Sequence, residues 1–367
     1  MINNPAHLDL RHRMGLALSE KLRRDADKMH PLKQLFWECT LRCNLHCRHC
    51  GSDCKVSSAF KDMPFDDFAK VLDSVAAKTD PHKVFVIITG GEPLMRTDLE
   101  KCGLAIYKKG FPWGMVTNGF LLTEKRYDAL LKSGLHTMTI SLDGLEEQHD
   151  WMRGVKGSYA RASEAIKMVA SSGKIIFDVV TCVNSKNYDH LDEIKAFLVD
   201  AGVKSWRLFT VFPVGRAATD TEMQLTNEQF RGLMRFIVQC RKDAKAEKPG
   251  SIMAEYGCEG FLGNFEGDVR SHFYTCQAGV SVGSVLCDGS ISACPSIRAD
   301  YHQGNIYQDD FMDVWEKRFE LYRDRSWMRK GDCADCKYWK YCKGNGMHLR
   351  DDNGNLILCH LKRLREE

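Results

Sequence analysis

Three closely spaced cysteines constrain this chain more than any other feature of its sequence. Cys43, Cys47 and Cys50 form a C-x3-C-x2-C array directly after a short apolar run at residues 35–37. Iron–sulfur clusters are held by cysteine thiolates, so three thiolates on one tight loop can hold three corners of a four-iron cube. The fourth iron then keeps a position for a small molecule, as catalytic metal sites do. The alternative interpretation is a zinc loop or a set of buried thiols.

From Leu35 onward, strand patterns alternate with helix patterns along the chain. Repeated strand–helix units of similar length predict a parallel sheet with helical crossovers. Two architectures fit this pattern, a doubly wound open sheet and a partial (β/α)6 barrel, and periodicity does not choose between them. The predicted strands are 34–39, 83–89, 112–117, 136–141, 174–181 and 204–211, and the predicted helices are 8–28, 66–78, 98–109, 123–133, 159–172, 189–201 and 226–245.

The ends of the predicted strands carry polar and glycine-rich motifs. Active sites of parallel sheets lie at the carboxyl ends of the strands. Paired glycines let a backbone approach a ligand closely, and proline makes the exit rigid. Arg153 lies beyond the fourth strand and could pair bidentately with a carboxylate or form a surface salt bridge. The motifs are Gly90-Gly91-Glu92-Pro93, Thr117-Asn118-Gly119 and Ser141-Leu142-Asp143-Gly144.

The cysteine array and these motifs, in this order, resemble the radical S-adenosylmethionine (radical SAM) superfamily over about residues 32–220. The resemblance implies a partial (β/α)6 barrel and a [4Fe–4S] cluster on Cys43, Cys47 and Cys50, whose free iron chelates SAM. Cys39 and Cys54 flank the array, but the family motif uses neither, so they are interpreted as ordinary thiols. His49 takes the place that the family gives to a ring beside the adenine. The implied SAM-binding residues are His49, Gly90, Gly91, Glu92, Pro93, Asn118, Ser141, Asp143 and Arg153.

A second set of cysteines in the last third of the chain resembles the SPASM extension of this superfamily, which binds two auxiliary [4Fe–4S] clusters. The family pattern assigns the outer cluster to Cys333, Cys336, Cys342 and Cys359.

The inner cluster departs from the pattern, because Gly346 stands where one thiolate is expected. Cys276 and Cys294 remain, and Cys258 is the first candidate to complete the set, ahead of Cys287. Three thiolates would leave one iron open to a substrate atom, a water or another side chain. A second departure is Pro295. Sulfatase maturases carry an aspartate at this place, so the sequence argues against their specific reaction.

Composition excludes several other classes of protein. A formal net charge of +3 on 367 residues is too small to predict nucleic acid or a membrane surface as the obligatory partner. No apolar run is long enough to span a membrane, and basic residues interrupt the N-terminus where a signal peptide would be apolar. Sixteen cysteines without an export signal indicate metal ligation, and therefore a cytoplasmic location. The predicted divisions are a helical segment at 1–31, the radical SAM barrel at 32–250 and the SPASM domain at 251–367.

These features together predict an oxidoreductase that cleaves SAM reductively to a 5′-deoxyadenosyl radical and abstracts hydrogen from a peptide or small protein. An electron donor such as flavodoxin or ferredoxin is the expected second partner. The first alternative is a radical SAM enzyme acting on a small-molecule precursor in cofactor biosynthesis. The second, from another class, is a zinc or electron-transfer module without catalysis, which would need neither Gly90–Pro93 nor Ser141–Gly144. The sequence does not identify the substrate, the bond formed, the fate of SAM or the oligomeric state.

Overall fold

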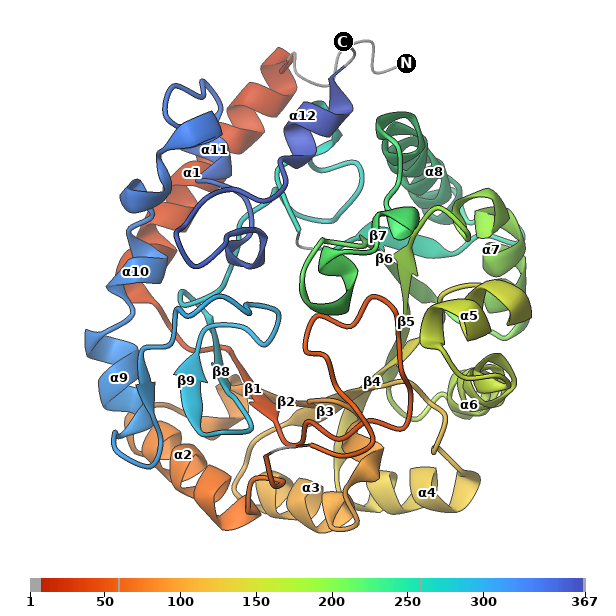
Figure 1. Cartoon of the computed structure of the whole chain (residues 1–367), viewed down its shortest axis with the longest axis vertical. Helices are drawn as coiled ribbons and strands as arrows, with labels where there is room; N and C mark the ends of the chain where they lie inside the picture. Colours follow the sequence, from red (N-terminus) through yellow and green to blue (C-terminus); the bar gives the residue numbers. More distant parts are fainter. Residues whose placement is uncertain (1–7, 59, 258, 366–367) are drawn as a thin grey trace.

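Ten strands join in one sheet that curves around the centre of the molecule (Figure 1). The structure is a computed structural model that describes residues 8–58, 60–257 and 259–365. Strands β1 to β7 run parallel in sequence order, β8 lies parallel on the other side of β1, and β9 and β10 extend that edge antiparallel. The predicted partial barrel is confirmed. The strands are β1 (Gln34–Glu38), β2 (Phe85–Thr89), β3 (Trp113–Thr117), β4 (Leu135–Ser141), β5 (Ile176–Val183), β6 (Ser205–Thr210), β7 (Met253–Tyr256), β8 (Val282–Val285), β9 (Ser290–Ser292) and β10 (Gly304–Asn305).

Helices cover the outer side of this sheet (Figure 1). The six predicted strands and the helices between them are confirmed to within a few residues, whereas α5 and the strands after residue 250 were not predicted. The helices are α1 (Leu10–Met29), α2 (Phe65–Lys78), α3 (Leu99–Lys108), α4 (Glu124–Lys132), α5 (Glu146–Arg153), α6 (Ser158–Ser172), α7 (Leu191–Asp200), α8 (Asn227–Lys245), α9 (Phe311–Lys317), α10 (Glu320–Arg323), α11 (Trp339–Cys342) and α12 (His360–Leu364).

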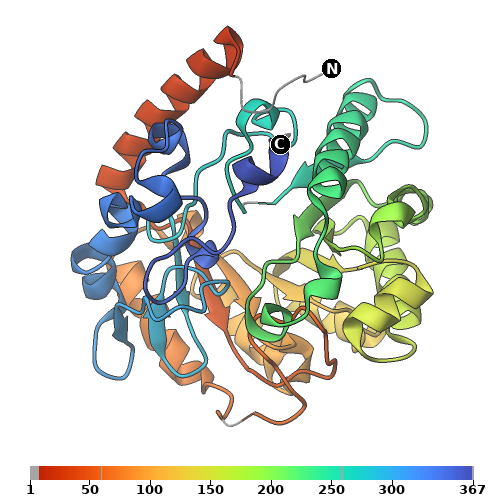
Figure 2. The ribbon, with the colours of Figure 1, turned by 45° about the horizontal axis from the view of Figure 1, so that its top comes forward.

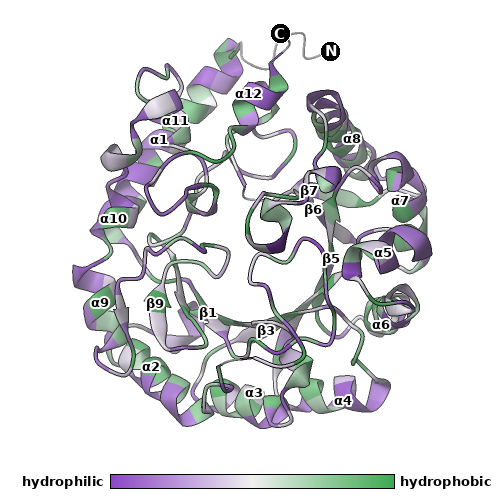
Figure 3. Cartoon of the chain, viewed as in Figure 1, coloured by the Kyte–Doolittle hydropathy of each residue, from purple (hydrophilic) through white to green (hydrophobic). Residues whose placement is uncertain are grey.

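The core lies between the sheet and these helices. In α2 the buried residues Phe68, Val71, Leu72 and Val75 follow the three- and four-residue spacing that places them on one helix face. Trp37 of β1 stacks on Phe68 with ring centroids 4.6 Å apart. Hydrophilic residues alternate with the hydrophobic ones along the outer helices (Figure 3). Burial of this apolar stripe therefore fixes how α2 faces the sheet.

The first helix packs differently from the prediction. Met14, Leu18 and Leu22 were predicted to form its apolar face, yet their side chains are more than half exposed, at 66%, 62% and 62%. Helix α1 lies along the outer edge of the molecule (Figure 2) and is held through buried Leu16 and through Arg23. The Arg23 guanidinium donates hydrogen bonds to backbone carbonyls of α11 at 2.9 Å. Polar contacts, not the apolar row, therefore orient this helix.

The cysteine-rich C-terminal region continues the same sheet. Residues 282–285 of β8 pair with residues 34–37 of β1, directly before the cysteine loop. This pairing brings the segment that follows β9 close to the loop, although the two are far apart in the sequence. The division predicted at residue 250 stays a prediction. Among the described residues no helix is long and apolar enough to cross a membrane.

Candidate active site

The cysteine array lies on the loop between β1 and α2, which is held by the end of α5 and by a side chain that follows β6. Backbone amides of His46 and Arg48 donate to carbonyls at the end of α5, at 3.1 and 2.9 Å. The Arg216 side chain, which follows β6, donates to the Cys47 carbonyl at 2.7 Å and to the Cys54 carbonyl at 3.0 Å. The loop is therefore fixed on several sides before any ligand binds.

One cavity of about 150 Å³ collects the predicted cluster ligands and most of the predicted SAM-binding residues. Two predicted residues lie outside its lining: Pro93 is buried in the turn after β2, and Asp143 lies behind Arg153. The sequence interpretation gave no role at this cavity to Cys54 or Arg216. The cavity is lined by Cys43, Cys47, His49, Cys50, Cys54, Thr89, Gly90, Gly91, Glu92, Val116, Thr117, Asn118, Ser141, Arg153 and Arg216.

The thiols of the array differ in acidity. A hydrogen bond from the Cys54 thiol lowers the pKa of Cys50 to about 5. Burial raises the pKa of Cys43 to about 12 and also raises the pKa of Cys47. Because the thiolate is the form that binds metal, loading iron must release protons from the two buried thiols. Cys54 thus donates a hydrogen bond to a thiol of the array, and its absence from the cluster ligands stays a prediction.

The glycine pair after β2 packs against the start of the cysteine loop. A side-chain carbon on Gly91 would lie 2.3 Å from the Arg42 carbonyl oxygen, and one on Gly90 would lie 2.2 Å from that of Thr40. The Gly91 amide donates to the Thr40 carbonyl at 2.7 Å. The glycine pair therefore packs closely on the protein's own cysteine loop, and its predicted contact with SAM stays a prediction.

Glu92 ties the ends of two neighbouring strands together. Its buried carboxylate accepts hydrogen bonds from the Thr117 hydroxyl and the Asn118 amide, each at 2.7 Å, and from the Leu94 amide at 3.1 Å. Burial raises its pKa, although these donors oppose the shift. The carboxylate thus orients the Thr117–Gly119 corner. Asn118 Nδ2 in turn lies 3.9 Å from Cys43 Sγ and 3.0 Å from Asn44 Oδ1.

Arg153 forms a buried ion pair and not a surface one. Its Nε lies 2.7 Å from Asp143 Oδ2, and its Nη1 lies 3.7 Å from the Cys47 sulfur. Burial alone would raise the pKa of Asp143, but the Arg153 guanidinium holds it below the usual value. Asp143 also accepts the Cys182 amide of β5 at 2.8 Å. The pair links β4, α5 and the cysteine loop through a chain of side chains.

His49 lines the cavity with one ring nitrogen unused. Burial lowers its pKa to about 4, so the ring is neutral near pH 7. Its Nε2 lies 3.9 Å from Asp143 Oδ2, and its buried Nδ1 has no hydrogen-bond partner among the residues that the structure describes. A buried polar atom that lacks a partner costs free energy, and a ligand in the cavity would remove that cost. Three thiols and an unpartnered ring nitrogen fit a cluster with a polar molecule beside it.

The four cysteines predicted for the outer cluster gather at α11 and α12. Cys336, Cys342 and Cys359 pack among Phe261, Tyr338 and Tyr341. Cys333 is close enough to affect the pKa of Cys342, which burial raises to about 12. The Arg350 guanidinium donates to the Cys333 sulfur, and the Asn345 amide donates to the Cys342 sulfur, both at 3.2 Å. These donors would stabilise thiolate sulfur in a cluster.

The predicted inner set is only partly described. Cys276 and Cys294 both lie near Tyr322, whereas Cys258 lies outside the described residues. A side chain on Gly346 would lie 2.5 Å from the His348 ring, so His348 fills the space of the missing thiol. The Cys276 sulfur accepts the Met347 amide, and the Arg325 guanidinium lowers the pKa of Cys276 against the effect of burial.

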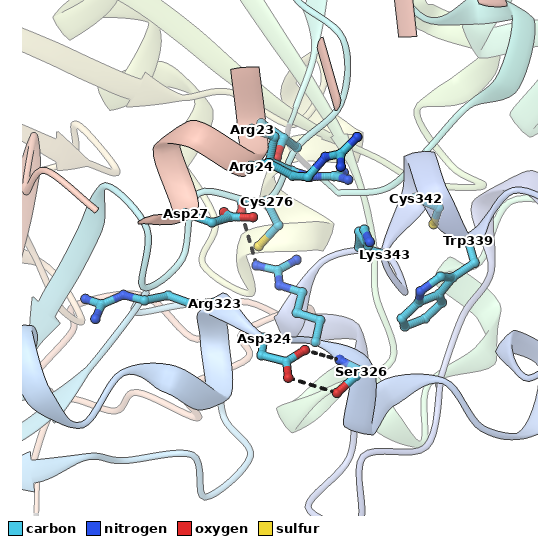
Figure 4. A pocket seen from close by; sticks show the side chains of 12 residues that line it. Arg23, Arg24, Asp27, Cys276, Arg323, Asp324, Ser326, Trp339, Cys342 and Lys343 are labelled. Carbon is cyan, nitrogen blue, oxygen red and sulfur yellow. Dashed lines mark hydrogen bonds between the residues drawn. The ribbon is translucent and has the colours of Figure 1, made fainter. Parts of the chain in front are cut away.

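A basic cavity of about 120 Å³ adjoins Cys276 and Cys342 (Figure 4). Five cations and two acids line it, together with Trp339. The cations come from α1 and from the SPASM region, so the first helix closes this side of the cysteine-rich domain. The charged residues are Arg23, Arg24, Asp27, Arg323, Asp324, Arg325 and Lys343.

Sequence comparisons match the same two regions of the chain, the one with the cysteine array and the cysteine-rich C-terminal one. The profile described as "Radical SAM superfamily" matches residues 37–198, and SPASM, described as "Iron-sulfur cluster-binding domain", matches residues 276–337. Mycofactocin maturase MftC of Mycolicibacterium smegmatis is 30% identical over 321 residues, which cover 85% of this chain and 77% of MftC. AdoMet-dependent heme synthase of Nitratidesulfovibrio vulgaris is 25% identical over 326 residues, which cover 85% and 86% of the two chains.

A solved structure shares the fold. Streptococcus suis SuiB bound to S-adenosylmethionine superposes with a TM-score of 0.67 at 18% identity, covering 86% of this chain and 74% of SuiB.

Proposed function

The chain belongs to the radical SAM superfamily and carries its SPASM extension, and on this premise we propose that it is an enzyme that abstracts hydrogen from a peptide or small protein. One observation carries the proposal. Cys43, Cys47 and Cys50 line a single cavity with the ends of β2, β3 and β4. A passive metal module needs no such convergence of strand ends.

When bound, the cluster and SAM supply the 5′-deoxyadenosyl radical. Cys43, Cys47 and Cys50 hold the cluster, while Gly90, Gly91 and Glu92 brace the loop that carries them. Asn118, Ser141, Arg153 and the neutral His49 ring position SAM through hydrogen bonds in the same cavity. Burial of the Asp143–Arg153 pair excludes water from behind that cavity. The places of these residues on the cavity wall, or directly behind it, support the roles proposed here.

Cys333, Cys336, Cys342 and Cys359 hold one auxiliary [4Fe–4S] cluster in this proposal. Cys276, Cys294 and Cys258 would hold the second, supplying three thiolates to its four irons. A one-electron donor such as flavodoxin or ferredoxin supplies the electron, and the enzyme works in the cytoplasm.

A peptide is favoured as substrate by the more similar of the two relatives described above. MftC is named as a maturase and is 30% identical. The second candidate is a small-molecule precursor, because heme synthases are 24–26% identical over 84–86% of this chain. Pro295 beside Cys294 disfavours the sulfatase-maturing reaction.

Deuterium transfer separates the two candidates. Fully deuterated candidate peptides, and separately deuterated porphyrin precursors, are incubated anaerobically with reconstituted enzyme, SAM and dithionite. The proposal predicts that a deuterium atom moves from a peptide carbon to the 5′-deoxyadenosine, so the peptide loses deuterium. Deuterium transfer from labelled porphyrin precursors and none from the peptide would establish the small-molecule alternative.

A further inference from the structure

A second cavity, of about 180 Å³, adjoins the cavity that holds the cysteine array. Thr89 and Gly90 line both cavities, so the two share a wall. The other walls of the second cavity come from the cysteine loop, from Phe212 after β6, and from Pro295, Ser296 and Arg298 of the SPASM region. The second cavity therefore lies between the cavity of the cysteine array, where SAM is proposed to bind, and the segment that follows Cys294.

One ion pair supplies the charge in this second cavity. Glu38 is 3% exposed, and its Oε1 accepts a hydrogen bond from Arg298 Nη2 at 3.1 Å. Its Oε2 accepts the Cys287 amide at 3.2 Å. Both carboxylate oxygens are thus engaged within the protein, and the buried group is poorly placed to bind a further cation.

Arg298 has hydrogen-bonding capacity left over. A guanidinium carries five N–H donors, and the contact with Glu38 is the one hydrogen bond that Arg298 makes among the described residues. Its side chain is 24% exposed and lines the cavity. Phe212 and Pro295 give the cavity an apolar surface as well. The Phe212 ring packs on the His348 ring, with the ring centroids 5.0 Å apart.

We propose that this cavity receives a carboxylate-bearing part of the substrate, bound by the free edge of Arg298 while its apolar part packs against Phe212. A planar guanidinium binds carboxylates bidentately, and Glu38 holds this one in place. The inference rests on the proposed function, because it places the substrate beside the SAM cavity. A peptide side chain, a peptide C-terminus and a small organic acid share this chemistry.

The test uses benzoate and its neutral analogue benzamide as probes. Full-length protein with reconstituted clusters is saturated with SAM under anaerobic conditions, and each probe is titrated by ligand-observed NMR. Benzoate should bind about tenfold more tightly than benzamide, because only benzoate satisfies the charged fork. Arg298→Met should abolish this preference, and Arg298→Lys should restore part of it.

Matched variants separate recognition from folding. Arg318→Met removes an exposed arginine that pairs with Asp309 at 2.8 Å, and it should keep the preference for benzoate. Should Arg298→Met misfold because Glu38 is left unpaired, the double variant Glu38→Gln/Arg298→Met removes both charges and gives the same readout. Equal binding of the two probes by the wild type, or a preference that survives loss of Arg298, would overturn the proposal.

Two different measurements test the proposed function and the carboxylate site: SAM cleavage tests the function, and probe binding tests the site. Wild-type protein that prefers benzoate but does not cleave SAM with dithionite would retain the carboxylate site and lose the radical function. Wild-type protein that cleaves SAM but binds both probes alike would retain the function and lose the carboxylate site.

Discussion

Arg153 Nε lies 2.7 Å from Asp143 Oδ2, and both side chains are buried between the end of β4 and the cysteine loop. The same guanidinium reaches the Cys47 sulfur at 3.7 Å. Because the Arg48 amide also donates to the Met152 carbonyl, the loop and α5 are joined by both backbone and side chain. Arg153 thus couples the stability of the barrel to the position of the cluster ligands.

Replacing Arg153 by Met should destabilise the apoprotein by about 3–5 kcal/mol, because Asp143 would keep a buried charge without its partner. Urea unfolding measures the loss. The double variant Asp143→Asn/Arg153→Met should recover much of it, since no charge is stranded. A single variant as stable as the wild type would contradict the buried ion pair.

Gly91→Ala should impair assembly of the first cluster. The new methyl group would lie 2.3 Å from the Arg42 carbonyl, so the cysteine loop must move away. The backbone of Gly91 is not left-handed, and the effect is therefore steric. Iron bound per protein measures the outcome. Gly202→Ala is the control, because its methyl group meets nothing within 4 Å and bears only the strain of its positive φ of 82°.

His149 should make the fold less stable in acid. Burial lowers its pKa to about 4 from an ordinary 6.5, and its Nδ1 accepts the Asp143 amide at 3.0 Å. Below about pH 6.5 His149 binds a proton in the unfolded chain but stays neutral in the folded chain. The free energy of unfolding therefore decreases as the pH is lowered.

One such proton contributes at most about 1.4 kcal/mol per pH unit between pH 6.5 and 4. His149→Gln has no titratable group at this position. Its amide oxygen can accept the same hydrogen bond at every pH. Urea unfolding of both apoproteins at a series of pH values gives the comparison. The stability advantage of the wild type should shrink as the pH falls, and a difference independent of pH would contradict this account.

Cys258 should be needed for a third cluster. The reconstituted wild type should hold about twelve iron atoms, and Cys258→Ala about eight. Cys287→Ala is the matched control, because its sulfur donates to the Lys61 carbonyl at 3.4 Å, and it should keep the full amount. Equal iron in the wild type and Cys258→Ala would remove Cys258 from the ligand set.

The barrel and the place of its site follow from local patterns in the sequence. Apolar strands alternate with amphipathic helices, and the strand-end motifs fall where parallel strands bring their carboxyl ends together. The cysteine array, Gly90–Glu92, Asn118 and Ser141 therefore meet at one cavity as predicted. Periodicity alone did not exclude an open sheet, because closure depends on contacts between distant strands.

Other features depend on packing that no local pattern encodes. Arg153 pairs with Asp143 only because α5 folds back over the end of β4. Arg298 and Glu38 are 260 residues apart and meet because β8 docks on β1. The apolar row of α1 shows helical spacing whether it faces the core or solvent, so its exposure was not predictable.

SAM cleavage by the anaerobic protein tests the proposed radical function. Wild-type enzyme reduced with dithionite should release 5′-deoxyadenosine and methionine from SAM. The triple variant Cys43→Ala/Cys47→Ala/Cys50→Ala should release none, while Cys39→Ala should keep most of the activity, because Cys39 is fully buried and does not line the cavity. Cleavage that survives loss of all three cysteines, or a wild type that cannot cleave SAM, would contradict the account.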